Sequence, residues 1–273
     1  MPEQEFPDPA PPGLAGWLRL VLRLIPLLVL NFGGLIVLLL LRLLERPLCG
    51  QHRPVTGRQV QLVCLLSLRI LGLRLSTRGR PMREGGAVVA NHSSWLDIYV
   101  LNAAQRVYFV AKSEVASWAG IGWLARSTGT VFIRRDRREA RAQTKLFRDR
   151  MGLGHKLLFF PEGTSTDNMR VLPFKSTLFD AFFDPELRPK LHIQPITVIY
   201  HAPYGADPRF YGWFGEMGFG GHVIQILSAR RGGSVEVIWH PALAAADLAD
   251  RKQMAAAAEA AVRGAMPPER QIS

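Results

Sequence analysis

The chain has 273 residues, which is room for one large domain or two small ones. Lysine and arginine number 34 against 22 aspartates and glutamates, a formal net charge of +12, so an acidic partner is expected: anionic lipid, nucleic acid or an acidic carrier protein. The 2 cysteines and 7 histidines show no C-x-x-C, H-E-x-x-H or mixed ligand spacing, so neither a metal site nor a disulfide framework is indicated.

The first 13 residues are acidic and rich in proline, and residues 1–13 are predicted to form a disordered tail. We do not expect them to form a secretory signal, because they lack a positively charged start and no small-residue cleavage site follows the apolar run.

Residues 14–44 are very apolar, and residues 24–41 carry no charge. That length is at the lower limit for crossing a hydrocarbon layer of about 30 Å. Pro26 and the pair Gly33-Gly34 interrupt the run, so a single spanning helix and a re-entrant helical hairpin are both compatible with the sequence. Arginines on both sides of the run leave its orientation open.

Residues 60–75 are apolar with two spaced arginines, Arg69 and Arg74, which predicts an amphipathic helix lying on the membrane or on the domain. We therefore predict membrane-anchoring helices over residues 14–76 and a separate α/β domain over residues 77–273.

Short apolar runs alternate with helical stretches from residue 78 onward. This pattern predicts an α/β fold with a mostly parallel central sheet flanked by helices, and an N-terminal membrane-associated helical segment. The predicted strands are residues 86–90, 106–111, 129–133, 156–160, 193–200 and 235–239. The predicted helices are residues 95–103, 116–126, 138–151, 176–183 and 248–263.

A histidine and a carboxylate stand at the turn between the first of these strands and the following helix. The stretch Asn-His-Ser-Ser-Trp-Leu-Asp contains His92 and Asp97. The two side chains can meet only if the histidine lies just outside the helix and the aspartate lies in its first turns, with Ser93 or Ser94 as N-cap. Asp97 would then fix the tautomer of the imidazole and leave the other ring nitrogen free to take a proton. The same residues are also ordinary turn and capping chemistry.

Two further stretches follow predicted strands. Four arginines lie within residues 134–138, and arginine at a helix start opposes the macrodipole unless an anion binds there. The run Phe160-Pro-Glu-Gly-Thr164 ends another buried strand, and its backbone amides could face a phosphate or an oxyanion. Lys175 lies close enough along the chain to reach the same cleft.

These stretches, followed by an apolar strand that Pro195 opens, resemble the motifs of the glycerolipid acyltransferase family of the 1-acyl-sn-glycerol-3-phosphate type. The family motifs N-H-x-x-x-x-D, G-x-x-F-I-x-R and F-P-E-G-T occur here in order and at matching spacing. The matched positions are Asn91, His92, Asp97, Gly129, Phe132, Ile133, Arg135 and residues 160–164.

The resemblance implies transfer of a fatty acyl group from a thioester, carried on acyl carrier protein or coenzyme A, to a lysolipid hydroxyl. His92 would act as general base, and Asp97 would orient it. Arg135 and Glu162 would bind substrate, and amides near Gly163 and Thr164 would stabilise the oxyanion. Arg134 and Lys175 are further substrate-binding candidates. No Ser or Cys nucleophile lies in a recognisable elbow, so attack is expected to be direct, without metal or cofactor.

One position departs from the pattern of phosphatidic-acid-forming members, in which an arginine follows the E-G-T sequence. Here that residue is Ser165, and the run through Asp167 resembles the bacterial lyso-ornithine lipid O-acyltransferases. An ornithine headgroup carries an amine, with which Asp167 could pair. Residues 210–217 resemble the same subgroup. The alternative is 1-acyl-sn-glycerol-3-phosphate acylation, with Arg134, Arg137 or Lys175 holding the acceptor's phosphate.

The expected location is the cytosolic face of a bacterial inner membrane, with the bilayer itself as a partner. A non-catalytic basic protein that binds membrane surfaces or nucleic acid is the alternative from another class. It rests on arginine content alone, because no recognisable nucleic-acid-binding module is present, and it leaves the spacing of the motifs unexplained. We therefore expect no nucleic-acid partner.

Overall fold

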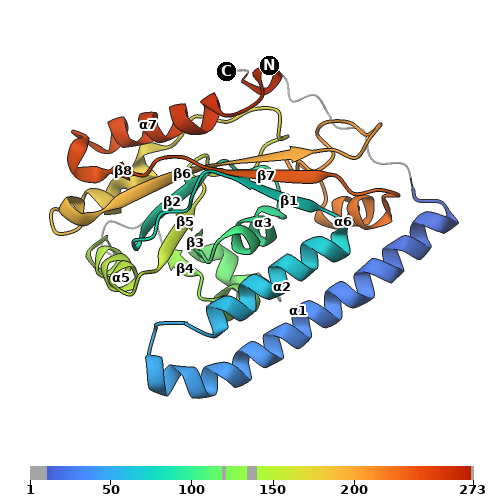
Figure 1. Cartoon of the computed structure of the whole chain (residues 1–273), viewed down its shortest axis with the longest axis horizontal. Helices are drawn as coiled ribbons and strands as arrows, with labels where there is room; N and C mark the ends of the chain where they lie inside the picture. The colour runs from blue at the N-terminus through green and yellow to red at the C-terminus, as the bar shows by residue number, and fades with distance from the viewer. Residues whose placement is uncertain (1–10, 119–120, 134–139, 272–273) are drawn as a thin grey trace.

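A computed structural model describes residues 11–118, 121–133 and 140–271. Its centre is an 8-stranded sheet in the order β1-β7-β6-β2-β5-β3-β4, with β8 paired to β6 (Figure 1). The strands are β1 (Arg74–Arg78), β2 (Gly86–Ala90), β3 (Tyr108–Lys112), β4 (Val131–Ile133), β5 (Lys156–Phe159), β6 (His192–His201), β7 (Ser234–Trp239) and β8 (Leu243–Ala244). Only the pairings of β6 with β7 and β8 are antiparallel, so the prediction of a mostly parallel sheet is confirmed.

Helices cover both faces of the sheet. The α-helices are α1 (Leu14–Cys49), α2 (Thr56–Leu71), α3 (Asp97–Ala104), α4 (Ile121–Thr128), α5 (Ala140–Gly152), α6 (Phe219–Ser228) and α7 (Arg251–Gly264). The 3₁₀ helices are η1 (Ser113–Ser117), η3 (Ser176–Phe183), η4 (Arg188–Lys190), η5 (Ala245–Asp247) and η6 (Pro268–Arg270). In Figure 1, α7 lies above the sheet, and α3, α2 and α1 lie below it.

Strand β2 occupies the middle of the sheet between β5 and β6, and all five of its residues are buried. Ala87 and Val89 pack into the cluster that contains α7, whereas Val88 and Ala90 pack into the cluster with α2 and α3. Burial on both faces explains why the strand is a continuous apolar run in the sequence. Whatever follows Ala90 is therefore positioned by a fully buried strand in the middle of the sheet.

The structure differs from the sequence prediction at several elements. The helix predicted over residues 60–75 ends at Leu71, because Gly72 adopts a left-handed conformation (φ 71°) that closes the helix. Strand β1 follows and crosses the boundary predicted between residues 76 and 77. Residues 176–183 form a 3₁₀ helix, and α6 and β8 were not predicted.

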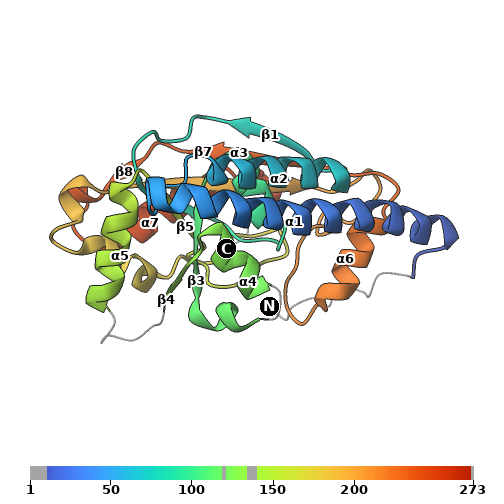
Figure 2. The same ribbon diagram turned by 90° about the horizontal axis from the view of Figure 1, so that it is seen from below.

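Helix α1 is continuous through Pro26 and the Gly33-Gly34 pair, so no hairpin forms within residues 14–44. The chain turns only after Cys49, and α2 then runs back along α1 (Figures 1 and 2). At 36 residues, α1 is about 54 Å long.

Contacts with the domain occur along much of α1. Near its start, Arg19 Nε donates to Ser228 O at the end of α6 (2.8 Å). In its middle, Asn31 Oδ1 accepts from the Tyr99 hydroxyl of α3 (3.1 Å). Further along, the Gly34 carbonyl accepts from Gln59 of α2 (2.8 Å). One stripe of α1 therefore belongs to the domain.

The opposite side of α1 leaves large apolar side chains exposed. They are Leu14, Trp17, Leu18, Val21, Leu22, Ile25, Leu28, Val29, Phe32, Ile36, Val37, Leu39, Leu40, Leu43, Leu44 and Leu48. By length and composition α1 is the one helix among the described residues that could cross a membrane. Only 17% of its apolar 18-residue segment is buried. A continuous apolar surface of this size marks a site of contact with a membrane or another protein.

Asn91 joins the end of β2 to its neighbour β6. Its side-chain amide donates to Val198 O (2.9 Å), and its Oδ1 accepts from Val198 N (2.7 Å). Changing Asn91 to Ala leaves both backbone groups of a fully buried residue unpaired, so the free energy of unfolding should fall by about 2–4 kcal/mol. Denaturant unfolding of the solubilised protein measures this loss.

Asn102→Ala is the matched control, because that buried amide makes a single bond to Ile98 O within α3 (3.2 Å). A loss for Asn91→Ala no larger than for Asn102→Ala would contradict the role assigned to this bridge.

Candidate active site

His92 and Asp97 face each other across the turn from β2 to α3. His92 follows the carboxyl end of β2 by two residues, and Asp97 is the first residue of α3. The His92 Nδ1 and Asp97 Oδ2 atoms are 2.7 Å apart. The histidine therefore lies outside the helix and the aspartate inside it, which is the arrangement that the five-residue separation requires.

The Asp97 carboxylate is fully buried and has four hydrogen-bond partners. Its Oδ2 accepts from the backbone amides of Ser93 (2.9 Å) and Ser94 (3.1 Å), in addition to the His92 ring. Its Oδ1 accepts from the Tyr200 hydroxyl (2.6 Å). Burial raises the pKa of Tyr200 well above its ordinary value, so this hydroxyl keeps its proton and donates. A carboxylate held in this way directs the proton of His92 to Nδ1.

The two serines do not cap α3, contrary to the sequence prediction. The N-cap position is Leu96, and no side chain caps the helix. Instead, the backbone amides of Ser93 and Ser94 donate to the side chain of Asp97, the first residue of the helix. This carboxylate thereby satisfies amides of the preceding turn, as the side chain of an N-cap residue satisfies amides of a helix. The Ser94 hydroxyl accepts from the Leu96 amide at 3.3 Å.

The His92 ring lies flat against Phe160, with ring centroids 4.0 Å apart and 14° between the planes. Its side chain is 21% exposed, whereas that of Asp97 is not exposed at all. Among the described residues, no protein group contacts Nε2 by a hydrogen bond. One ring nitrogen is therefore fixed by the protein and the other faces outward.

The sequence predicts a substrate contact for Glu162, and in the structure both of its carboxyl oxygens bind the backbone. Its Oε1 accepts from the His92 amide (2.6 Å), and its Oε2 accepts from the Leu172 amide (2.7 Å). The side chain is 1% exposed. Both oxygens have backbone partners because the E-G-T turn lies directly beside the histidine. Glu162 holds the His92 backbone in place.

Gly163, Thr164 and Lys175 lie together at the rim of this turn. Gly163 has a positive φ of 78°, and a side chain there would stand 2.8 Å from Lys175 Nζ. The Gly163 amide already donates to Phe160 O (3.1 Å), so it is not available to an oxyanion. Thr164 and Lys175 are exposed. Lys175 therefore lies beside the E-G-T turn, and the amide of Thr164 is the remaining candidate donor to an oxyanion.

Ser165 fastens a distant segment to this turn. Its hydroxyl donates to the Trp213 carbonyl, and the Trp213 amide donates to Ser93 O (2.8 Å). Residues 210–217 are thereby tied to both the histidine motif and the E-G-T motif. Asp167, predicted to meet an ammonium group of the substrate, is paired with Arg170 instead (2.7 Å) and is 6% exposed.

Arg134 and Arg135 lie outside the described residues. The sequence carries no signal for Tyr200, because it is one apolar position in a buried strand. Trp213 lies within residues 210–217, but the resemblance of that stretch does not single out this residue. Within the described part of the chain, no group of three or more His, Cys, Asp or Glu side chains is placed to hold a metal ion.

This geometry can take a proton from a hydroxyl that approaches Nε2. The ring is oriented by Asp97, its stacking on Phe160 fixes its plane, and the backbone of the turn is held by Glu162. These are the features of a general base with an orienting carboxylate. The described residues near His92 place no serine or cysteine side chain in hydrogen-bond contact with the ring.

The sequence profile of the family described as Acyltransferase matches residues 74–199. The chain is 57% identical over 262 residues to the lyso-ornithine lipid O-acyltransferase of Rhodobacter capsulatus, covering 96% of this chain and 95% of that protein. The chain therefore belongs to the acyltransferase family. It is also 38% identical, over 110 residues and 39% of its length, to the 1-acyl-sn-glycerol-3-phosphate acyltransferase of Neisseria gonorrhoeae.

The crystal structure of the 1-acyl-sn-glycerophosphate acyltransferase PlsC of Thermotoga maritima has the same fold, with a TM-score of 0.66 and 19% identity over 91% of this chain and 94% of that one. A protein named lyso-ornithine lipid O-acyltransferase in Pseudomonas aeruginosa is 30% identical over 91% of this chain and 94% of its own.

Burial raises the pKa of Glu162 from 4.5 to about 8, although the two backbone amides act in the opposite direction. The folded state thus binds this proton more tightly than the unfolded state. The resulting stabilisation is complete below pH 4.5 and is lost as the pH rises through 8. The melting temperature of the wild type relative to Glu162→Gln should therefore fall across this range.

Glu114→Gln is the control, because Glu114 is exposed. If the difference in melting temperature between wild type and Glu162→Gln does not change between pH 4.5 and 8, the Glu162 carboxyl is not held protonated.

Proposed function

We propose that this protein transfers a fatty acyl group from a thioester to the free hydroxyl of lyso-ornithine lipid. The observation that carries the proposal is a histidine with Nδ1 fixed by a buried aspartate and Nε2 facing outward. The match to a lyso-ornithine lipid O-acyltransferase over 96% of the chain supports the choice of acceptor.

In the proposed mechanism, Nε2 of His92 takes the proton of the acceptor hydroxyl as its oxygen attacks the thioester carbonyl. The Thr164 amide would stabilise the resulting oxyanion, and Arg135, which lies outside the described residues, would bind substrate. When the carbon–sulfur bond breaks, the thiolate takes the proton from the imidazolium, and the ester is released without an acyl-enzyme. Asp97 stabilises the imidazolium that forms between the two steps. General-base assistance of this kind contributes roughly 10²–10⁴-fold.

The acceptor preference is assigned to Ser165 and the segment that it holds. The position that is arginine in phosphatidic-acid-forming members is here a small hydroxyl bonded to the Trp213 carbonyl. Without an arginine at this position, the site does not repel a headgroup that carries an ammonium. Residues 210–217 would then border the headgroup, with Lys175 nearby; Arg134, which lies outside the described residues, remains a candidate for binding substrate. The alternative is 1-acyl-sn-glycerol-3-phosphate as acceptor.

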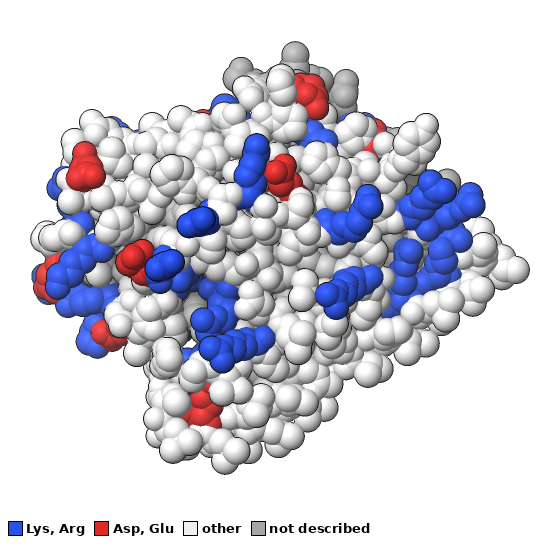
Figure 3. Space-filling model, in the orientation of Figure 1, with Lys and Arg blue, Asp and Glu red and all other residues white. Residues whose placement is uncertain are grey.

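The donor is proposed to be acyl carrier protein or coenzyme A thioester. The net charge of +12 suits either of these anionic carriers. Figure 3 shows a face of the molecule on which most of the charged side chains are lysine or arginine and few are acidic. Exposed arginines of α2 and β1 are Arg58, Arg69, Arg74 and Arg78.

The protein is proposed to lie on the cytosolic face of the bacterial inner membrane, where acyl thioesters are available. The exposed apolar side of α1 would enter the membrane, while its other side stays bound to the domain at Arg19, Asn31 and Gly34. A helix held at these three points does not leave the domain to cross the bilayer. We therefore propose that α1 lies in the plane of one leaflet.

His92→Ala should reduce acyl transfer by about 10³-fold, because the general base is lost while the fold is retained. The assay gives the detergent-solubilised protein a labelled acyl thioester with lyso-ornithine lipid, and separately with 1-acylglycerol-3-phosphate.

His192→Ala is the control, since His192 lies at the amino end of β6, the opposite end from the site. Wild-type rates in His92→Ala would disprove the mechanism, and faster acylation of 1-acylglycerol-3-phosphate by the wild type would overturn the assigned acceptor.

Ser165→Arg should lower kcat/KM for lyso-ornithine lipid by about tenfold and lower the preference for it over 1-acylglycerol-3-phosphate. The added cation repels the ornithine ammonium, and the bond to the Trp213 carbonyl is lost.

Ser165→Ala, which loses only that bond, should reduce both activities by about fivefold and leave the preference unchanged. An unchanged preference in Ser165→Arg would remove Ser165 from the account of specificity.

Both ends of α1 should react with a membrane-impermeant thiol reagent from the same side of sealed vesicles. Cys49 is the natural thiol at the end of α1, and Gly13→Cys adds one before its start. The background carries Cys64→Ala, because Cys64 is buried.

Inside-out vesicles should be labelled at both positions and right-side-out vesicles at neither. Labelling of the two positions from opposite sides would show that α1 spans the bilayer.

A further inference from the structure

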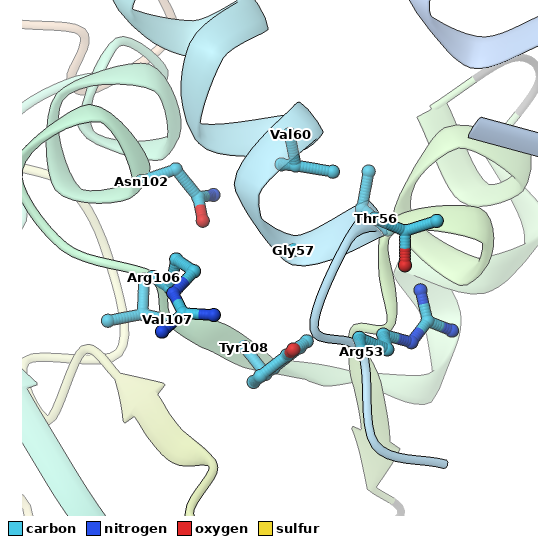
Figure 4. Close-up of a pocket in the computed structure, with 9 residues that line it drawn as sticks. Arg53, Thr56, Gly57, Val60, Asn102, Arg106, Val107 and Tyr108 are labelled. Atoms are coloured by element: carbon cyan, nitrogen blue, oxygen red, sulfur yellow. The ribbon is translucent and has the colours of Figure 1, made fainter. Parts of the chain in front are cut away.

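A second polar site lies at the amino ends of the strands, on the opposite edge of the sheet from His92. Two adjoining cavities share the lining residues Arg53, Arg106 and Tyr108. The larger cavity has a volume of about 140 Å³ and is also lined by His155 and Lys156. Figure 4 shows Arg53 and Arg106 on either side of the Tyr108 ring. No carboxylate lines either cavity.

The cations of this site are held in place by the protein backbone and by rings. Arg53 Nη1 donates to Ser127 O (2.7 Å). Arg150, which is 6% exposed, donates from Nη2 to Gly129 O (2.9 Å) and lies over the Tyr108 ring at 4.7 Å from its centroid. Gly129, the glycine of the second motif, has φ 95° and no side chain, which lets Arg53 approach within 3.1 Å of where a Cβ would stand.

His155 supplies a hydrogen-bond donor that has no protein partner. Its Nδ1 accepts from Arg150 Nε (2.8 Å), so its proton must lie on Nε2. The residue is 4% exposed, and among the described residues Nε2 is unpaired. Nε of Arg53 is likewise buried and unpaired. Both unpaired donors belong to residues that line the larger cavity, and an acceptor with several oxygens would satisfy them.

The electrostatics of the site point in the same direction. Burial and the surrounding arginines lower the pKa of His155 to about 3, and burial with Arg42 and Arg150 lowers the pKa of Arg53 to about 10. Two carboxylates act on these cations, Glu45 on Arg53 and Glu84 on Lys156. Glu45 already accepts from Thr56, Val55 and Arg42. Neither carboxylate is among the described residues that line the cavities.

We propose that this cavity binds a phosphate group, held by Arg53 and Arg106 with the His155 Nε2–H as a third donor. Guanidinium groups match the oxygens of phosphate in geometry and charge. The phosphate belongs either to a phospholipid headgroup or to a small soluble phosphate. The cavity lies beside the chain between α1 and α2, where Leu48 and Val55 are exposed, so a headgroup could enter from the apolar side of α1. The phospholipid alternative depends on the membrane contact proposed for α1, whereas the soluble-phosphate alternative does not.

Binding to the full chain in an uncharged detergent tests the proposal by calorimetry with two probes: inorganic phosphate, and dihexanoyl phosphatidylglycerol below its micelle concentration. Arg106→Gln is the main variant, because Arg106 is exposed and its loss should not affect folding. It should weaken binding about tenfold or more, as should Arg53→Gln. Arg58→Gln, an exposed arginine of α2 outside the cavity, should bind within twofold of the wild type.

A histidine nitrogen spectrum gives an independent readout, because the His155 Nε2–H signal should shift when the probe binds and acyl transfer is not involved. Tighter binding of the lipid probe identifies a headgroup site, and tighter binding of inorganic phosphate identifies a soluble ligand; either supports the proposal. No binding of either probe, or equal weakening in Arg58→Gln, overturns it, whatever the outcome of the acyl-transfer assays.

Discussion

The buried Asp97 carboxylate is the group on which the rest of the site depends. A charge with no exposed surface is tolerated only when hydrogen bonds replace water, and here two backbone amides, the Tyr200 hydroxyl and the His92 ring do so. Two of these donors come from the turn that carries the histidine itself. The requirement to satisfy one carboxylate therefore fixes the turn, the ring and the tautomer together.

The sheet brings the remaining parts to this carboxylate. Parallel pairing places the ends of β2, β5 and β6 at one edge, so residues that follow three distant strands meet there. Glu162 follows β5 and holds the His92 amide, while Thr166 donates its amide to His92 O at 2.9 Å. Tyr200 comes from β6. The motifs are therefore held together by contacts to backbone groups. The site is assembled before substrate binds.

Much of this arrangement follows from local sequence. The apolar runs identified the central strands, and the His-to-Asp spacing predicted a pair at a strand-to-helix turn. The contacts of Glu162 and Asp167 were not predictable, because both side chains are bound by groups that the sequence does not place near them: the Leu172 amide and the Arg170 side chain. Tyr200 carries no local signal, since it is one position in a fully apolar strand. Helix α2 lies four residues earlier in the chain than the predicted range 60–75, since Gly72 closes it after Leu71.

Helix α1 is a second case in which the sequence predicts an element but not its contacts. Hydropathy identifies an apolar helix but does not say whether one side of it is bound to protein. Contacts from Arg19 to Gly34 decide this, and their partners lie in α6, α3 and α2. The arginines of the second cavity are likewise brought together only by the fold, because Arg53 and Arg106 are far apart in the sequence and neither belongs to a motif.

The most direct test of the account is the tautomer of His92, read from the nitrogen chemical shifts of histidine-labelled protein at neutral pH, with His92→Ala used to assign the signals. The account predicts that Nδ1 carries the proton, shared with Asp97, and that Nε2 shows the shift of an unprotonated nitrogen. A proton found on Nε2 would contradict the account, because the outward nitrogen could not then accept the proton of an acceptor hydroxyl.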